Sequence, residues 1–309
     1  MCGLFGISTY GEKTVLNLSE ITQSLAAASA IRGTDATGIA YNSDGRLTVY
    51  REPKSAYEIH FRVPKKARTV MGHTRHTTQG SAQDRINNHP FPGRTGGGFF
   101  ALAHNGILAN DAQLRKQYKL PKTKVETDSY VAVQLLEQAG RIDFRSLKNM
   151  AEAVHGSFSF SVLDSSDNLY LVKGDSPLSV LHFPTQKAFA YASTDQILLE
   201  ALAGTSLLYS LYDKAFEPVP IKGGEILKIR RDGTVAREGF ALPDEYGLGR
   251  YCWWAQRYVP PKRYQEAYLD DLMSVAQCMG YAPEQIEDLL REGFSLEEIE
   301  DVLYSEHGM

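Results

Sequence analysis

The second residue of the chain, Cys2, occupies a position in which one amino acid can supply both a nucleophile and a base. If Met1 is removed, Cys2 carries its thiol and a free α-amine. An α-amine titrates at about 7.7–8.0 and a thiol at about 8.5. A fraction of the amine is therefore unprotonated at neutral pH and can accept the thiol proton, directly or through a water. The alternative interpretation is that Cys2 is an apolar residue buried in a first strand.

A thiol that attacks an acyl group needs hydrogen-bond donors at the position where the oxyanion forms. The segment "AHNGIL" offers two of them, the side-chain amide of Asn105 and the backbone N–H of Gly106. We expect both on one tight turn. The alternative is that this Asn-Gly pair is present only because it makes a good turn.

Two further residues have charges that suit an amino-acid substrate. In "GHTRHTTQG", Arg75 is placed at the end of a strand, where a guanidinium can bind a carboxylate with paired hydrogen bonds. In "ETDSY", Asp128 is placed at the start of a helix, where its carboxylate can accept bonds from an ammonium group. Ordinary N-capping of that helix is the alternative for Asp128.

Taken in order along the chain, these segments resemble a known family. The motifs "CGLFGI", "RGTDATG", "GHTRHTTQG", "NNHPF", "AHNGIL", "ETDSY" and "YASTDQILLEAL" are similar in order and approximate spacing to those of class II glutamine amidotransferases. These are N-terminal nucleophile hydrolases, typified by the glutaminase domains of glucosamine-6-phosphate synthase and glutamine phosphoribosylpyrophosphate amidotransferase. The resemblance covers about residues 2–240 and implies a four-layer αββα sandwich that hydrolyses glutamine to glutamate and ammonia.

The resemblance also implies a role for each matching residue. Cys2 would be the nucleophile and its α-amine the base. Asn105 and Gly106 would form the oxyanion hole. Arg75 would bind the α-carboxylate of L-glutamine, and Asp128 its α-amine.

A second group of residues is expected around that site. His76 and Thr78 lie on the loop that closes over glutamine in the family, and His76 stands where Trp or Tyr is often found. Closure of this loop would exclude water and retain ammonia. Arg32 and Asp35 in "RGTDATG" either support the site or form a structural turn.

Composition excludes several classes of protein. The chain has 309 residues and a formal net charge of -4, which argues against a nucleic-acid partner. Its cysteines, Cys2, Cys252 and Cys278, are too few for a disulfide framework. Together with the lack of a membrane-spanning apolar run, they predict a cytoplasmic protein. We expect no cofactor and no metal, because the His73-x-x-His76 pair has no cysteine or acidic triad nearby.

The coarse pattern predicts an α+β fold of antiparallel sheets faced by helices. It indicates a strand over Gly3–Thr9 and a helix over Ser19–Ile31 with Ser19 as its N-cap residue. It also indicates helices over 127–140 and 145–154. Short strands follow from Ser157. We expect a glutaminase domain over residues 2–242, an aromatic and Pro-rich connector over 243–261, and an acidic helical extension over 262–309.

Three functions remain open from the sequence. The first is the glutaminase subunit of an amidotransferase, with ammonia passed to a separate synthase or amide-forming ligase, because residues after 240 hold no recognisable acceptor domain. The second is an N-terminal-cysteine amidohydrolase acting on another amide, and the third is a non-catalytic glutamine-binding regulatory protein. The extension either docks the partner enzyme or caps the sandwich, and the sequence is compatible with a homo-oligomer.

Overall fold

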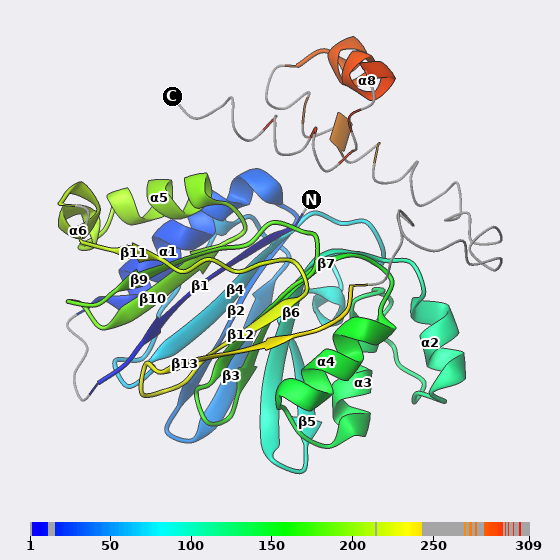
Figure 1. Ribbon diagram of the computed structural model, residues 1–309, viewed down its shortest axis with the longest axis horizontal. Coiled ribbons are helices and arrows are strands. Elements are labelled where there is room, and N and C mark those ends of the chain that lie inside the picture. Colours follow the sequence, from blue (N-terminus) through cyan, green and yellow to red (C-terminus); the bar gives the residue numbers. More distant parts are fainter. Residues whose placement is uncertain are drawn as a thin grey trace. The chain divides into compact units, whose positions relative to one another are not determined.

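The computed structural model describes residues 2–11, 16–213 and 215–242, and in the C-terminal part residues 269, 272–273, 276, 281–292, 294, 296, 299 and 303. The chain divides into two compact units, of which the larger is Cys2–Leu242 and the other consists mainly of Pro243–Met309. Figure 1 shows the ribbon of both units. Among the described residues, no helix combines the length and the apolar character needed to cross a membrane.

The first sheet of the larger unit has seven strands in the order β11-β9-β10-β1-β4-β2-β3. Every pair of neighbours in it is antiparallel. Its strands are β1 (Gly3–Thr9), β2 (Ala36–Ser43), β3 (Arg46–Glu52), β4 (Thr69–Arg75), β9 (Ser179–Phe183), β10 (Ala188–Ala192) and β11 (Glu217–Pro218).

The second sheet has six strands in the order β13-β12-β8-β7-β6-β5, again with antiparallel neighbours throughout. Its strands are β5 (Phe91–Thr95), β6 (Gly98–Leu108), β7 (Gly156–Asp164), β8 (Leu169–Lys173), β12 (Glu225–Ile229) and β13 (Val235–Gly239).

Helices cover the outer face of each sheet, as Figure 1 shows. On the first sheet lie α1 (Leu18–Ser29), α5 (Asp195–Ala203) and α6 (Leu208–Tyr212), and on the second lie α2 (Asp111–Gln117), α3 (Tyr130–Ala139) and α4 (Phe144–Ala153). Single 3-10 turns occur at η1 (Ala30–Arg32), η2 (Ala56–Glu58) and η3 (Arg85–Asn87). The result is four layers, helix–sheet–sheet–helix, which confirms the predicted αββα fold.

The buried residues explain why the layers stack in this way. All seven residues of β1 are buried. Because successive side chains of a strand point to opposite faces, Phe5 and Ile7 pack under the helices of the first sheet, while Leu4 packs into the core shared by the two sheets. A strand covered on both faces reads as a continuous apolar run, so the expected strand Gly3–Thr9 has the bounds seen in the structure.

Two local predictions were wrong. The N-cap of α1 is Asn17, whose side chain accepts from the Glu20 backbone N–H at 3.4 Å. Ser19 instead exchanges hydrogen bonds with the backbone of Val63. Asn105 and Gly106 do not form a tight turn, because both lie within the long strand β6.

The described part of the C-terminal unit has a small apolar core of its own. Its helix α8 spans Pro283–Glu292. The residues of the extension buried in that core are Leu272, Ala276, Ile286, Ile299 and Leu303. The predicted connector, residues 243–261, lies outside the described residues, as do Cys252 and Cys278.

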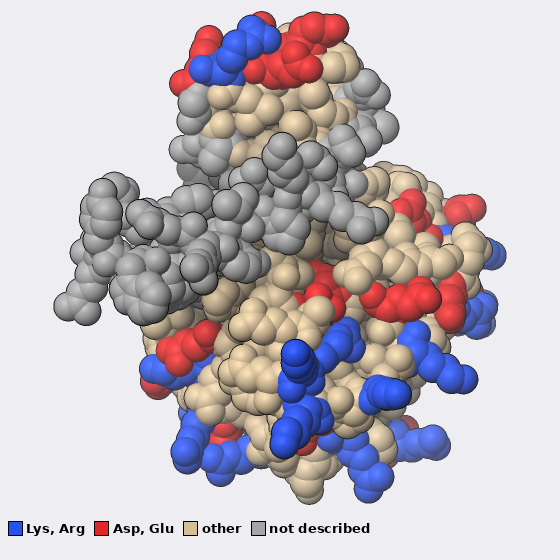
Figure 2. Space-filling view, turned by 90° about the vertical axis from the view of Figure 1, so that its right-hand side faces the viewer, with Lys and Arg blue, Asp and Glu red and all other residues tan. Residues whose placement is uncertain are grey.

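The surface of the sandwich carries charges of both signs. Figure 2 shows basic and acidic side chains on the same face of the molecule. Some charged residues of the sandwich form exposed pairs, as Lys66 and Asp44 do at 2.7 Å. Such exposed pairs contribute little to stability, and their mixture agrees with the small net charge of -4.

Candidate functional site

The candidate nucleophile lies where β1 begins. Cys2 directly precedes this strand, and its thiol donates to the His76 carbonyl with an Sγ–O distance of 3.5 Å. The register between β1 and β4 pairs Gly3 with Thr74, which brings Cys2 beside Arg75 at the end of β4. The structure therefore brings together two predicted site residues that are far apart in the sequence.

The "RGTDATG" segment forms hydrogen bonds with the backbone of Cys2 and with the backbone at the end of β4. The fully buried Arg32 donates from Nε to the Cys2 carbonyl at 2.8 Å. Asp35 accepts the Thr77 backbone N–H at 2.7 Å and donates its own N–H to the Arg75 carbonyl at 3.0 Å. Arg32 and Asp35 thus position Cys2 and the loop that follows β4.

The structure leaves no room for a side chain at Gly33. A Cβ at this residue would lie 2.3 Å from the carbonyl carbon of Arg75 and 2.5 Å from the His76 nitrogen. The "RGTDATG" segment therefore passes against the peptide bond that joins these two residues. Any larger residue would push the strand end away from Cys2.

The guanidinium of Arg75 is buried and is covered by the loop that follows it. It donates from Nη1 to Asn88 Oδ1 at 2.6 Å, and from Nη2 to the carbonyls of Gln79 at 2.6 Å and Gly80 at 3.2 Å. A guanidinium has five N–H groups, which is more than these three contacts use. The half-buried His76 and the exposed Thr78 lie on this same loop.

Two asparagines that the sequence analysis did not assign to the site hold the loop in place. Asn88 donates to the Ala82 carbonyl at 2.7 Å and also contacts Arg75. Asn87 donates to Glu126 Oε2 at 2.9 Å and accepts the Glu126 backbone N–H at 2.9 Å. The available signal was the motif "NNHPF", in which adjacent amides offer donors and acceptors in both directions.

Asp128 does not cap a helix with its side chain. The helix α3 begins at Tyr130, and Ser129 stands at its cap position without a side-chain capping bond. The buried Asp128 carboxylate instead accepts the backbone N–H of Leu108, the last residue of β6, at 2.6 Å. This contact ties the start of α3 to the strand that carries Asn105 and Gly106.

Asn105 and Gly106 face a part of the molecule where the two sheets approach each other. The side chain of His73 in β4 hydrogen-bonds to the carbonyl of His104, the residue before Asn105, at 2.9 Å. The amide nitrogen of Asn105 is buried and has no hydrogen-bond partner among the described residues. Gly106 has a φ of +131°, and a Cβ there would lie 2.1 Å from the Ser157 carbonyl oxygen.

Charge and burial act in opposite directions on the groups near Cys2. Burial raises the pKa of the Cys2 thiol, and the positive charges of Arg75 and Arg32 offset part of this effect. Burial likewise lowers the pKa of Arg75, while the negative charges of Cys2, Asp35 and Asp128 raise it. A thiol with a raised pKa is protonated at neutral pH, so its reaction requires a base nearby.

Three histidines are buried close to this site. The rings of His73 and His89 lie with their centroids 4.2 Å apart, and His104 Nδ1 lies 2.8 Å from Ser129 Oγ. Burial lowers the pKa of His73 to about 3. Over the described ranges of the chain, no group of His, Cys, Asp and Glu side chains is arranged to hold a metal ion.

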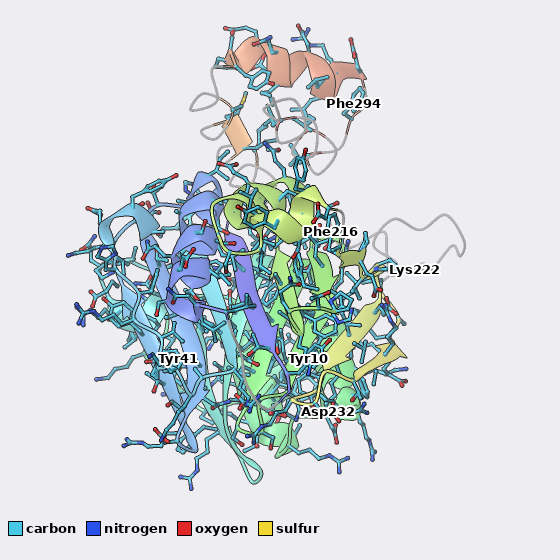
Figure 3. All side chains as sticks on the ribbon, turned by 90° about the vertical axis from the view of Figure 1, so that its left-hand side faces the viewer. Tyr10, Tyr41, Phe216, Lys222, Asp232 and Phe294 are labelled. Carbon is cyan, nitrogen blue, oxygen red and sulfur yellow. The ribbon has the colours of Figure 1, made fainter. Side chains whose placement is uncertain are left out.

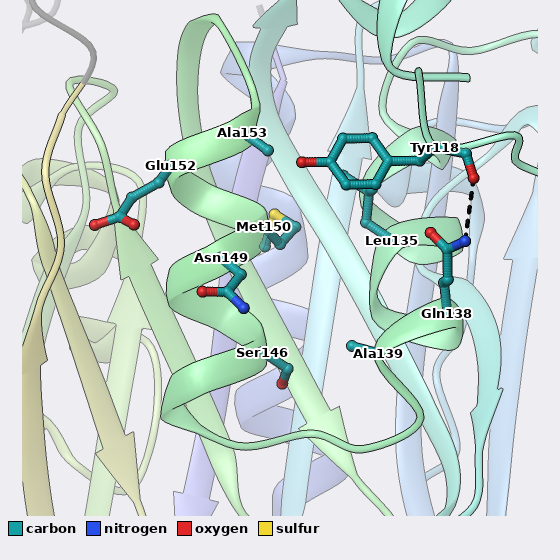
Figure 4. A pocket seen from close by; sticks show the side chains of 9 residues that line it. All are labelled: Tyr118, Leu135, Gln138, Ala139, Ser146, Asn149, Met150, Glu152 and Ala153. Atoms are coloured by element: carbon teal, nitrogen blue, oxygen red, sulfur yellow. Dashed lines mark hydrogen bonds between the residues drawn. The ribbon is translucent and has the colours of Figure 1, made fainter. Parts of the chain in front are cut away.

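A separate hollow of about 440 Å³ opens over the helices that cover the second sheet. Figure 4 shows side chains of α3 and α4 lining it, with the Tyr118 carbonyl accepting from Gln138 Nε2 at 3.1 Å. None of the predicted site residues lines this hollow. The hydroxyl of Ser146 in its lining donates to the Asp143 carbonyl at 3.0 Å and belongs to the cap of α4, so the hollow adds nothing to the site at Cys2.

Comparison with known proteins agrees with this arrangement. Residues 73–200 match the family described as a glutamine amidotransferase domain. A glutamine–fructose-6-phosphate aminotransferase (isomerizing) from Bacillus cereus is 32% identical over 188 residues, which is 58% of this chain and 30% of the relative. Its counterpart from Staphylococcus aureus is 28% identical over 244 residues, 76% of this chain and 38% of the relative. The chain therefore spans about a third of the length of these relatives.

Two solved structures share the fold. Glutamine phosphoribosylpyrophosphate amidotransferase from B. subtilis, complexed with ADP and GMP, has a TM-score of 0.61 at 23% identity, over 78% of this chain and 50% of that one. A structure described as the allosteric regulatory enzyme of purine biosynthesis has a TM-score of 0.62 at 24% identity, with the same coverage. At these identities the likeness concerns the fold.

The four-layer sandwich is the fold that the chain shares with these two structures. The family match over residues 73–200 and the curated relatives support a class II glutamine amidotransferase domain.

Proposed function

We propose that the protein hydrolyses L-glutamine to glutamate and ammonia, with the Cys2 thiol as nucleophile. The observation that carries this proposal is the convergence of Cys2, Arg75 and Asp128. A guanidinium and a carboxylate near one thiol suit the α-carboxylate and the α-ammonium of an amino acid. An N-acylated amide lacks that ammonium group, so the same pair favours free glutamine over other amides.

The proposed reaction uses groups of the chain throughout. The α-amine of Cys2, freed by removal of Met1, takes the thiol proton, and the sulfur attacks the side-chain amide carbon of glutamine. The oxyanion accepts hydrogen bonds from Asn105 Nδ2 and the Gly106 N–H. The protonated amine then gives its proton to the departing ammonia, and water hydrolyses the thioester to release glutamate.

The unpartnered amide of Asn105 supports its role as an oxyanion donor. A buried N–H group without a partner costs free energy, and a charge that develops in the transition state supplies the missing acceptor. Loop residues Gln79 and Gly80 already cover Arg75. Their position supports a loop that closes over the substrate and retains ammonia.

Covalent capture by the glutamine analogue 6-diazo-5-oxo-norleucine tests this function. We expect intact-mass measurement to give a chain that lacks Met1 and carries one adduct at Cys2. Excess glutamine should slow the labelling, whereas N-acetylglutamine should not. A fully active chain that retains Met1, or an adduct at another residue, would show that the proposed mechanism is wrong.

Replacing Asn105 with alanine should separate catalysis from stability. We expect kcat for ammonia release to fall about 10²–10³-fold with little change in KM, because only the transition state uses this donor. The melting temperature should fall less than when other buried asparagines are replaced by alanine. The amide nitrogen of Asn105 has no hydrogen-bond partner among the described residues, so no such bond is lost.

The matched control is Asn149→Ala, which removes an exposed amide on α4. It should leave both kcat and the melting temperature unchanged. An Asn105→Ala variant with unaltered kcat would remove Asn105 from the oxyanion hole.

We also propose that the ammonia passes to a separate synthase or amide-forming ligase in the cytoplasm. The name of the Bacillus cereus relative, glutamine–fructose-6-phosphate aminotransferase, supports transfer of the released nitrogen to an acceptor. If the synthase is a separate protein, the purified chain should release ammonia from glutamine without forming an aminated product. Amination of an acceptor by the purified chain alone would contradict this part of the proposal.

A further inference from the structure

A second cavity, of about 450 Å³, lies at the end of the sandwich away from Cys2. It is lined by Gly11, Arg68, Asn168, Arg230, Arg231 and Asp232. Gly11 lies just beyond the end of β1, while Cys2 lies just before its start. Since β1 has seven residues that rise about 3.3 Å each, the two places are separated by roughly 23 Å.

The cavity is built from turns of both sheets. The first sheet contributes Gly11 after β1 and Arg68 before β4, and the second contributes Asn168 before β8 and the turn between β12 and β13. Figure 3 shows Tyr10 and Asp232 at the same end of the sandwich. A Cβ on Gly233 would lie 2.5 Å from the Tyr10 ring, so this turn packs directly against the first sheet.

Hydrogen bonds fix the turn that carries two of the arginines. Asp232 accepts from the backbone N–H of Thr234 at 2.9 Å and from its hydroxyl at 2.6 Å. Arg230 donates its backbone N–H to the Thr234 carbonyl at 2.9 Å. The backbone positions of Arg230 and Arg231 are therefore set before any ligand arrives, which lowers the entropy cost of binding.

The cavity concentrates positive charge. Its lining has three arginines and one acid, Asp232, whose carboxylate already serves the turn. The ammonium of Lys187 is also near, because a Cβ on Gly11 would lie 3.6 Å from its nitrogen. No ion pair between described residues includes Arg68, Arg230 or Arg231. Arg68 donates instead to the Gly11 carbonyl, and Arg230 to the Thr234 hydroxyl at 3.1 Å.

Two further acids lie near this cluster. The carboxylate of Asp164 already accepts hydrogen bonds from the backbone and the side chain of Asn168, at 3.0 and 2.8 Å. Asp167 interacts with the charges of Arg231 and Arg68, but its side chain also accepts a hydrogen bond from Asn42 at 3.0 Å. It therefore offsets only part of the charge. Like charges held together destabilise a fold unless an anion offsets them.

We propose that this cavity binds a small molecule that carries a diphosphate group. Guanidinium groups pair with phosphate oxygens through parallel hydrogen bonds, and several of them favour an anion with several charges. The volume falls in the usual range for small-molecule sites. The inference does not depend on the proposed glutaminase function, because binding at this end of the sandwich requires neither Cys2 nor glutamine.

Titration calorimetry of the full chain with inorganic phosphate, pyrophosphate and ADP tests the proposal. We expect pyrophosphate to bind at least about tenfold more tightly than phosphate, and both to weaken as salt is added. The double variant Arg230→Gln, Arg231→Gln should lose at least about tenfold in pyrophosphate affinity. Both side chains are exposed, so the variant should keep its melting temperature and its ammonia release.

The matched control is Arg145→Gln, which removes one exposed guanidinium from α4. It should leave pyrophosphate affinity unchanged. ADP that binds more tightly than pyrophosphate would identify a nucleotide as the source of the diphosphate, and equal affinities would identify the diphosphate group alone. Absence of saturable pyrophosphate binding, citrate affinity equal to that of pyrophosphate, or full affinity in the double variant would each overturn the proposal.

Discussion

Replacing Cys2 with alanine should lower glutamine hydrolysis by about 10⁴-fold or more, the scale of loss when a hydrolase is deprived of its nucleophile. The proposed reaction forms a bond between the Cys2 sulfur and the amide carbon, and alanine has no atom that can take that place. The fold should persist, because Arg32 contacts the backbone carbonyl of Cys2 rather than its side chain. Ammonia release at saturating glutamine measures the loss, and thermal unfolding checks the fold.

Inserting one alanine between Met1 and Cys2 provides the control that separates the two roles of this residue. The thiol is kept, but its α-nitrogen becomes part of a peptide bond and can no longer act as a base. Burial raises the pKa of the Cys2 thiol, so little thiolate is present without that base. We expect a loss of activity close to that of Cys2→Ala. Retained activity would mean that another group takes the thiol proton.

Local patterns were sufficient for much of the fold. The apolar run of β1 depends on neighbours in the sequence, and this strand was predicted with the bounds Gly3–Thr9. Arg75 was expected at the end of a strand, and β4 does end at this residue. Its last residue is polar, yet it pairs with Ala36 in the ladder. Pairing with another strand is invisible in a local hydrophobic pattern.

The candidate site, like the fold, could be predicted from the sequence only in part. The chemistry of Cys2, Arg75 and Asp128 can be inferred from residue type and position, whereas the contacts that hold them cannot. Arg32 and the Cys2 carbonyl are 30 positions apart. Asn105-Gly106 was interpreted as a turn because that is its commonest local use. In the fold, glycine is needed at 106 because the chain of β7 passes so close.

The three buried histidines give the second large prediction, a loss of stability in mild acid. Burial lowers the pKa of His73 to about 3 and that of His89 well below its ordinary value, and it lowers the pKa of His104 as well. In the unfolded chain these groups bind protons below about pH 6.5. The native state resists protonation until the pH is much lower, so acid favours unfolding.

The sign and size of the effect follow from these values. The stability contributed by the neutral histidines is fully present above about pH 6.5 and is lost as the pH falls toward the native pKa. For His73 alone, the free energy of unfolding should fall by about 2 kcal/mol between pH 7 and pH 5. His89 and His104 act in the same direction. The combined loss is a large part of the total of about 5–15 kcal/mol for a typical protein.

Urea unfolding at pH 7, 6 and 5 measures this loss, and two variants assign it. His89→Phe should lower by one the number of protons taken up on unfolding, and so weaken the pH dependence of the free energy of unfolding. Phenylalanine fits this position because both ring nitrogens of His89 are buried without partners among the described residues, and the ring already packs on Phe91. The exposed His60 is the matched control, and His60→Gln should leave the dependence unchanged. Equal free energies of unfolding at pH 7 and pH 5 would mean that the three buried rings accept protons in the native state, which would require water or an anion to reach them.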